Sequence, residues 1–315
     1  MEYTARTRPV DSQTNGRIMI VKCLQTTGQG YFEEVDYDKP EPSDTEIEVK
    51  AVMTGVCRSD IDMMQGNFGP LPLEMQGHEG LGIVTKVGKD INPYSSVKVG
   101  SYVATRGEPA YADYYNCREN EFVVVDELHP KYILEPVACG INCVVDNFQD
   151  RPETKTLILG SGFLAWVVYN NLKFHFKNME VDVLGSSNTE LWGDKLLLGT
   201  TESYDNIIDL SGKYELGTEI NLNNNALIID AVGKAVSKEE AQSQLWKAVT
   251  TIKPSPRTPN FINAMYQARY MIENGKLEVD SFWTKGYNRT TEWKQAFEDG
   301  VNRPEGYSRG YIKWD

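Results

Sequence analysis

The chain has 315 residues, of which 40% are hydrophobic and 10% aromatic, and its 32 Lys and Arg against 45 Asp and Glu give a net charge of −13. This composition excludes a disordered chain and a small disulfide-stapled one, because a chain of this length buries about three quarters of its surface on folding. The acidic excess argues against a nucleic-acid partner, whose phosphates would be repelled. The expected partner is therefore a small molecule.

No apolar run approaches the roughly 20 residues that cross a bilayer, and the N-terminal stretch lacks the apolar core of a signal peptide. We therefore expect no membrane partner and a cytoplasmic location. In that reducing compartment, the five cysteines are expected to be thiols or metal ligands rather than disulfides.

The first part of the chain predicts an all-β unit. Glycines and prolines separate short β-prone runs between about residues 18 and 125. The expected strands are Ile18–Cys23, Glu46–Met53, Leu81–Val87, Ser101–Ala104 and Phe122–Val125.

From about Thr154 the pattern changes to apolar strands, a glycine turn and longer helical segments, which indicates βαβ units and a parallel sheet. The expected strands are Thr156–Leu159, Val181–Leu184, Asn206–Asp209 and Ala226–Asp230. Helices are expected over residues 162–177, 261–274 and 291–299, the second of them ending at Gly275. A closing strand at Tyr311–Trp314 can return to the first unit.

Three separate stretches each offer a residue that zinc accepts as a ligand: Cys57, His78 and Glu135. A catalytic zinc takes three protein ligands and leaves a fourth position open for substrate oxygen. One thiolate, one imidazole and one carboxylate neutralise the charge of Zn²⁺, which moderates the cost of burying the metal. Glu79 as a further direct ligand would make the site negative, so we expect it beside the ligands or exchanging with one of them.

The same spacing also fits a site without metal, because widely separated single ligands are a weak motif. Cys57 would then be a small core residue, His78 a turn residue bonded to the backbone, and Glu135 a solvated carboxylate. The residues around them distinguish the two interpretations.

The segment Gly55-Val-Cys-Arg-Ser-Asp60, followed by Gly77-His-Glu-Gly-Leu-Gly-Ile-Val-Thr-Lys-Val-Gly88, resembles the zinc-dependent medium-chain alcohol and polyol dehydrogenases. The resemblance extends from Ile18 to the C-terminus. It implies an α/β plus β fold: a GroES-like β-barrel catalytic domain carrying zinc, and a Rossmann domain whose doubly wound parallel sheet binds a nicotinamide cofactor.

The resemblance also assigns roles within the first unit. Cys57 and His78 match zinc ligands, and Glu135 matches the third ligand of the sorbitol-dehydrogenase-like members. Ser59 matches the hydroxyl that relays the alcohol proton, while zinc stabilises the alkoxide as a Lewis acid. Asp60 matches the carboxylate that holds the ligand imidazole and fixes its tautomer.

A glycine turn between the expected strand Thr156–Leu159 and the following helix predicts a dinucleotide site. Gly160 permits the tight turn, Gly162 lets the backbone approach the pyrophosphate, and Ala165 replaces the third glycine at the contact between helix and strand. An unliganded turn remains possible, since the motif alone is not specific. By resemblance, Arg58 is a further contact to the pyrophosphate.

The end of the second strand of this unit should contact the cofactor's 2′ group, where NAD enzymes commonly place an acidic residue. Here Ser186 and Ser187 occupy that place, and the first carboxylate is Glu190. Because hydroxyls donate hydrogen bonds to a 2′-phosphate that a carboxylate would repel, the sequence favours NADP over NAD. Gly212, at a later strand end, resembles positions that line the cofactor cleft in this family.

Part of the family pattern is missing. The structural zinc of many members needs four closely spaced cysteines, and only Cys117 lies between Ser101 and Glu135. We therefore expect one catalytic zinc per chain. The resemblance implies a homo-oligomer, a dimer or a tetramer.

The sequence thus predicts a two-domain enzyme. Residues 1–145, completed by about 276–315, form the GroES-like zinc domain, and residues 146–275 form the Rossmann domain. The expected reaction is hydride transfer between NAD(P) and an alcohol, polyol or sugar, or its carbonyl product.

Three alternatives remain open at this point. One is a metal-free quinone or enone reductase of the same superfamily. Another is a dehydrogenase of a hydroxyethyl tetrapyrrole, because the short chain and the strand end at Ser211-Gly212 resemble the bacteriochlorophyllide-type members. The third is a non-catalytic binding protein.

Overall fold

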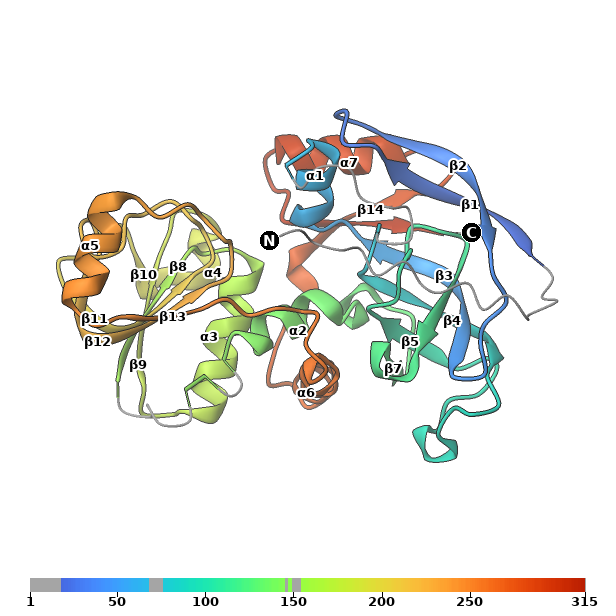
Figure 1. The fold of residues 1–315 in the computed structure, drawn as a ribbon, viewed down its shortest axis with the longest axis horizontal. Helices are drawn as coiled ribbons and strands as arrows, with labels where there is room; N and C mark the ends of the chain where they lie inside the picture. The colour runs from blue at the N-terminus through green and yellow to red at the C-terminus, as the bar shows by residue number, and fades with distance from the viewer. Residues whose placement is uncertain (1–17, 68–75, 145–146, 149–153, 315) are drawn as a thin grey trace.

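The structure is a computed structural model that describes residues 18–67, 76–144, 147–148 and 154–314. It forms two lobes that lie side by side, each built around its own sheet (Figure 1). Within the described residues, none of the helices has the length and apolar character needed to cross a membrane.

The first lobe contains a seven-stranded sheet whose main path runs β14-β15-β3-β4-β5-β7, with β6 paired to β3. A separate hairpin, β1-β2, lies beside it (Figure 1). The bounds are β1 Met19–Thr26, β2 Phe32–Lys39, β3 Glu46–Gly55, β4 Gly80–Val87, β5 Tyr102–Thr105, β6 Tyr114–Arg118, β7 Phe122–Val125, β14 Trp283–Asn288 and β15 Arg309–Lys313. The C-terminal strands β14 and β15 therefore complete the sheet that the N-terminal half begins.

The second lobe contains a six-stranded parallel sheet in the order β10-β9-β8-β11-β12-β13. The bounds are β8 Lys155–Leu159, β9 Glu180–Leu184, β10 Leu196–Leu197, β11 Ser203–Asp209, β12 Asn221–Asp230 and β13 Thr250–Ile252. Chain order reverses between β8 and β11, which is the switch point where doubly wound sheets bind ligands. The predicted doubly wound fold is confirmed.

Seven α-helices are described in the two lobes. They are α1 Arg58–Met64, α2 Glu135–Asn142, α3 Phe163–His175, α4 Thr189–Trp192, α5 Lys238–Trp246, α6 Phe261–Glu273 and α7 Trp293–Asn302. Helices α2 and α6 pack against each other between the lobes, with α3 against α2 and β7 against α6 (Figure 1).

Side-chain alternation explains how the parallel sheet is buried on both faces. In β8, Leu157 and Leu159 pack into one apolar cluster, and Ile158 packs into the cluster on the opposite face together with Val168 and Leu172 of α3. Successive side chains of a strand point to opposite faces, so a continuous apolar run is typical of a strand covered on both sides.

All the predicted strands and helices are present, with ends shifted by a few residues. The largest shift is in β12, which begins at Asn221 rather than Ala226 because Asn221 and Leu222 already pair with β11. Residues 210–220, which link these strands, contain no helix.

The predicted domain boundary at residues 145 and 146 falls outside the described residues. The parallel sheet itself spans residues 155–252. Helix α6, which the prediction places in the Rossmann domain, shares an apolar cluster with β7 and α2. The domain limits stay a prediction.

Candidate active site

The antiparallel pairing of β3 and β4 brings the first two candidate ligands together. Thr54 near the end of β3 pairs with Gly80 at the start of β4, so Cys57 and His78, which flank these strand ends, become neighbours. One possible ligand atom each from Cys57, His78 and Glu79 lies within 4.8 Å of the other two.

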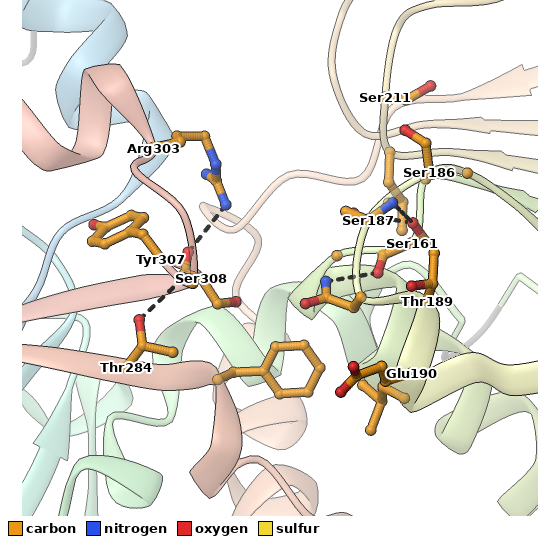
Figure 2. Close-up of a pocket in the computed structure, with 18 of the residues that line it drawn as sticks. Ser161, Ser186, Ser187, Thr189, Glu190, Ser211, Thr284, Arg303, Tyr307 and Ser308 are labelled. Carbon is orange, nitrogen blue, oxygen red and sulfur yellow. Dashed lines mark hydrogen bonds between the residues drawn. The ribbon is translucent and has the colours of Figure 1, made fainter.

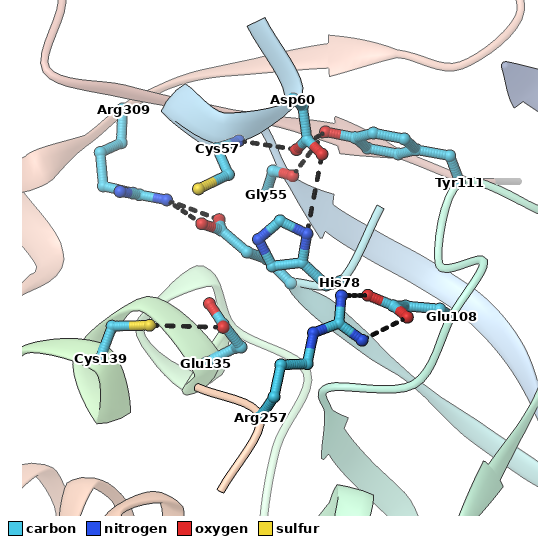
Figure 3. A network of polar contacts seen from close by, with 11 residues as sticks. Gly55, Cys57, Asp60, His78, Glu108, Tyr111, Glu135, Cys139, Arg257 and Arg309 are labelled. Carbon is cyan, nitrogen blue, oxygen red and sulfur yellow. Dashed lines mark hydrogen bonds and ion pairs between the residues drawn. The ribbon is translucent and has the colours of Figure 1, made fainter. Parts of the chain in front are cut away.

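Asp60 holds both candidate ligands in place. Its Oδ2 accepts hydrogen bonds from the Cys57 backbone N–H at 3.1 Å and from the Tyr111 hydroxyl at 2.7 Å, and its Oδ1 lies 3.6 Å from Nδ1 of His78 (Figure 3). That Oδ1 is buried without a hydrogen-bond partner. The imidazole thus turns Nδ1 toward a carboxylate and leaves Nε2 available, which is the usual arrangement around a metal-binding histidine.

Burial and charge dominate the electrostatics of this cluster. Burial lowers the pKa of His78, but the neighbouring Asp60 and Glu135 carboxylates and the Cys57 thiol hold that pKa well above its usual value. Burial raises the pKa of Asp60, and burial together with Glu79 raises the pKa of the Cys57 thiol. Negative charge is therefore concentrated around the imidazole.

Glu135 begins α2, where Pro136 occupies the first turn. Its side chain is 2% exposed, and its Oε1 accepts a hydrogen bond from the Cys139 thiol at 3.4 Å (Figure 3). Burial, reinforced by Glu79, raises the pKa of Glu135 to about 7. The charge of Glu135 acts on His78, but Glu135 is not one of the three residues whose possible ligand atoms lie within 4.8 Å of one another. The carboxylate in that group belongs to Glu79.

Glu79 is already neutralised by a cation. Nη2 of Arg309 donates to both Glu79 oxygens, at 2.6 and 2.5 Å, across 230 residues of sequence. The guanidinium lies 4.8 Å from the ring of Phe163 and 4.9 Å from that of Trp283. Sequence reasoning missed Arg309, since no local motif marks it.

The donor set of this site fits zinc. A thiolate, an imidazole and a carboxylate are its usual ligands, and the unpartnered Asp60 Oδ1 beside Nδ1 of His78 suits an imidazole that donates there while its other nitrogen binds metal. Cys57, His78 and Glu135 would hold the ion, with the Glu79 carboxylate beside them bound to Arg309.

Ser59 and Arg58 lie in the first turn of α1, directly after Cys57. Ser59 is half-buried and Arg58 is exposed. The Arg58 guanidinium pairs with Asp62 at 3.1 Å and lines the large cavity between the lobes. One short helix thus connects the metal-type cluster with that cavity.

The cavity has a volume of about 1190 Å³ and opens at the switch point between β8 and β11. Its walls come from both lobes: the ends of β8, β9 and β11 on one side, and segments 281–284 and 303–308 on the other (Figure 2). A dinucleotide lying across the carboxyl ends of the strands would occupy this position.

The glycine turn has the geometry predicted for it. Gly160 has φ +113°, a conformation that favours glycine, and no atom lies within 4 Å of a Cβ built on Gly162, the N-cap of α3. The N-terminus of α3 thus presents open backbone to the cavity, as pyrophosphate binding requires. Ala165 is buried in the core instead, as expected for the third position.

Five of the predicted cofactor residues line the cavity, namely Arg58, Gly160, Gly162, Ser186 and Ser187. Ala165 and Gly212 do not; Gly212 makes a turn at φ +64°, and its backbone N–H donates to Asp209.

Ser161, the middle residue of the glycine turn, was not singled out from the sequence. It is 2% exposed; its Oγ accepts from the Ser187 backbone N–H at 2.9 Å and lies 3.0 Å from the Ser187 hydroxyl (Figure 2). Gly185 makes room for it, because a Cβ there would lie 2.5 Å from the Ser161 Oγ. Ser161 therefore positions the loop that carries Ser186 and Ser187, which we call the serine loop.

Comparison with known proteins agrees with this geometry. Residues 43–132 match the alcohol dehydrogenase GroES-like domain. Over the whole fold, the chain is similar to a thermostable alcohol dehydrogenase from Pyrobaculum aerophilum, with a TM-score of 0.73, 15% identity, and 94% of this chain and 100% of that chain covered. Residues 43–132 thus form an alcohol dehydrogenase GroES-like domain, and the whole chain shares the fold of that enzyme.

Two further similarities are informative. Staphylococcus aureus TarJ in complex with NADPH has a TM-score of 0.73 and 16% identity over 94% of this chain and all of that chain. An alcohol dehydrogenase of Schizosaccharomyces pombe is 40% identical over 78 residues, which are 24% of this chain and 21% of that enzyme. The chain thus matches about a fifth of the length of that curated relative.

Proposed function

We propose that the chain is an NAD(P)-dependent oxidoreductase that transfers hydride between the nicotinamide and an alcohol, polyol or sugar, or its carbonyl product. The observation that carries this proposal is the position of α1, which begins beside the zinc-type cluster of Cys57 and His78 and presents Arg58 to the dinucleotide-sized cavity. The start of that helix therefore carries both a residue that would hold the metal, Cys57, and one that would contact the dinucleotide, Arg58.

In this proposal the zinc supplies Lewis-acid stabilisation of the substrate oxygen. Ser59, two residues after Cys57, takes the proton from the substrate hydroxyl and passes it outward. The Asp60 carboxylate, 3.6 Å from Nδ1 of His78, would favour the imidazole tautomer that binds metal through Nε2. Neither residue takes part in hydride transfer itself.

We propose Glu135 rather than Glu79 as the third ligand. Arg309 engages both oxygens of Glu79, so that carboxylate would have to break an ion pair to bind metal. Glu135 is held only by a thiol hydrogen bond from Cys139 among the described contacts. A thiol is a weak hydrogen-bond donor, so turning the Glu135 carboxylate toward a metal costs less free energy than turning that of Glu79.

The proposed cofactor is NADP, since Ser186 and Ser187 line the cavity where an NAD enzyme commonly has a carboxylate. We also propose one zinc per chain, which the single cluster of possible donors among the described residues supports. Homo-oligomerisation and a cytoplasmic location stay predictions from the sequence.

The decisive experiment measures zinc per chain in protein purified without added metal, for the parent and for Cys57→Ser, Glu135→Ala and Glu79→Gln. We expect about one zinc in the parent, loss in the first two variants and retention in Glu79→Gln, which keeps a partner for Arg309. A parent without zinc would overturn the mechanism and favour the metal-free reductases. Loss from Glu79→Gln with retention in Glu135→Ala would exchange the roles of the two glutamates.

With the metal established, the parent should oxidise small alcohols or polyols, or reduce their carbonyls, with NADP(H). Absence of turnover with every alcohol and carbonyl class, despite bound zinc and cofactor, would contradict the proposed reaction.

A further inference from the structure

No basic residue stands next to Ser186 and Ser187 in the sequence, although both serines line the cofactor cavity. Ser186 and Ser187 are neutral donors, and the nearest basic residue that follows them, Lys195, lies over the ring of Tyr169 at 5.2 Å. Hydroxyls alone would leave a phosphate dianion without a counter-charge to offset its lost hydration, whereas an arginine supplies both positive charge and bidentate hydrogen bonds.

The tertiary structure supplies that cation from 116 residues further along the chain. Arg303 follows the last turn of α7 and lines the same cavity as Ser186 and Ser187. Figure 2 shows its guanidinium on the wall that faces the serine loop across the cleft.

The conformation of Arg303 directs its side chain into the cleft. The residue caps α7 in the left-handed region, at φ +46°. Its Nη2 donates to the Ser308 carbonyl oxygen at 3.1 Å, and the guanidinium lies 5.7 Å from the ring of Tyr307. One donor is therefore used for anchoring, and the planar group keeps other N–H donors for a ligand.

Unlike the other arginines near the cleft, Arg303 is not paired with a carboxylate among the described residues. Arg309 is bound to Glu79, and Arg58 pairs with Asp62. Lys213, four residues after the end of β11, is the remaining cation of the cavity wall.

Two carboxylates share the cavity and limit where an anion can bind. Glu190 lies near the opposite end of the drawn cavity wall from Ser186, and Glu305 follows Arg303 by two residues (Figure 2). A phosphate near Ser186 and Ser187 would thus face Arg303 while remaining away from Glu190.

We propose that Arg303 acts across the cleft with Ser186 and Ser187 to bind the 2′-phosphate of NADP(H), so that cofactor preference is set jointly by the two lobes. The inference rests on the proposed function, in which a dinucleotide occupies this cavity. The end of the second strand, 24 residues beyond Gly162, is where such sheets contact the adenosine ribose, and an arginine nearby accommodates a 2′-phosphate.

The test uses binding rather than turnover, so that it does not depend on metal or substrate. Isothermal titration calorimetry compares 2′,5′-ADP with 5′-AMP, which differ only by the 2′-phosphate, on the full chain. The variants are Arg303→Asn, which tolerates the left-handed backbone, and Arg303→Lys, which keeps the charge. Lys294→Gln is the matched control, since it removes one positive charge from the same helix outside this cavity.

The parent should bind 2′,5′-ADP about tenfold tighter than 5′-AMP or better, as expected for one charge-assisted contact. Arg303→Asn should lose most of that ratio with its 5′-AMP affinity unchanged, Arg303→Lys should keep part of it, and Lys294→Gln should match the parent. Ser186→Asp should lower the ratio as well, which tests the facing wall if Arg303→Asn fails to fold.

The possible outcomes distinguish a failure of the role given to Arg303 from a failure of the proposed cofactor site. An unchanged ratio in Arg303→Asn, or an equal loss for both nucleotides, would overturn the role of Arg303 and leave the dinucleotide site intact. Equal affinities in the parent would overturn the NADP preference and this inference together. If neither nucleotide binds, the cofactor assignment itself fails.

Discussion

At the scale of single residues, Gly55 leaves the space that the Glu79 carboxylate fills. A Cβ built on Gly55 would lie 2.0 Å from Oε2 of Glu79, and Glu79 is fully buried. The carboxylate cannot move away freely, because Arg309 binds both of its oxygens.

Gly55→Ala should therefore lower the free energy of unfolding by about 1–3 kcal/mol, the usual cost of overpacking a buried site. Urea unfolding measures the change. Gly199→Ala is the control, because no atom lies within 4 Å of its Cβ position, and its stability should stay near that of the parent. Equal stability of Gly55→Ala and the parent would show that Glu79 repacks without cost.

Ser59 gives a second prediction at this scale. Ser59→Ala removes the proposed proton relay without touching a candidate ligand, so kcat should fall by about 100-fold to 10,000-fold, the usual contribution of a positioned proton-transfer group. Zinc content and nucleotide affinity should stay at the parent values. A variant with unchanged kcat would remove Ser59 from the mechanism.

At the scale of elements, a buried ion pair fastens β2 to β3. Nζ of Lys39 lies 2.6 Å from Oε2 of Glu48, and the two side chains are 1% and 3% exposed. Lys86 of β4 approaches the same oxygen at 3.2 Å, and the Thr85 hydroxyl donates to Oε1 at 2.8 Å. Glu48 thus connects three strands.

This arrangement predicts acid sensitivity. Burial raises the pKa of Glu48, but the hydrogen bonds and charge of Lys39, with those of Thr85 and Lys86, outweigh it and hold the pKa below its usual value. Because the folded-state pKa is the lower one, the ionised carboxylate stabilises the fold above the unfolded value of about 4.3, and the contribution is lost as pH falls through the folded pKa.

Urea unfolding of the parent and of Glu48→Gln between pH 7 and pH 3 measures this effect. The parent should be more stable at pH 7, and the difference should shrink as pH falls below about 4.3. A difference that stays constant over this range would show that the charge of Glu48 contributes nothing.

At the scale of the whole molecule, one bidentate ion pair joins the two lobes beside the candidate site. Nη1 of Arg257, in the segment after β13, donates to Oε2 of Glu108 at 2.9 Å, and Nη2 donates to Oε1 at 2.5 Å (Figure 3). Glu108 belongs to the segment between β5 and β6. The pair therefore couples the parallel sheet to the other lobe.

A double-mutant cycle of Glu108→Gln and Arg257→Gln should give a coupling energy of about 0.5–1 kcal/mol in unfolding, because Arg257 is 47% exposed and solvent screens the pair. The coupling should fall at 1 M salt. Additive effects of the two substitutions would show that this ion pair contributes nothing to holding the lobes together.

Elements that the sequence did not predict also have physical explanations. Strand β2 was missed because exposed acidic residues such as Glu33 and Glu34 break the apolar alternation of a strand at the edge of a hairpin. Helix α5 is largely exposed and lacks an apolar face, yet a signal was present. Ser237 and Glu240 have capping-box spacing, and Ser237 Oγ accepts from the Glu240 backbone N–H at 3.1 Å.

The sequence by itself determined the glycine turn at Gly160, the strands around it, and the identities of Cys57 and His78 as candidate ligands. These depend on backbone dihedral preferences, side-chain periodicity and residue chemistry, which act over a few residues. Only the tertiary structure decided that Arg309 neutralises Glu79 and that Arg303 faces Ser186. Such pairs join segments more than 100 residues apart, and their meeting depends on how β14 and β15 close the first sheet beside the second.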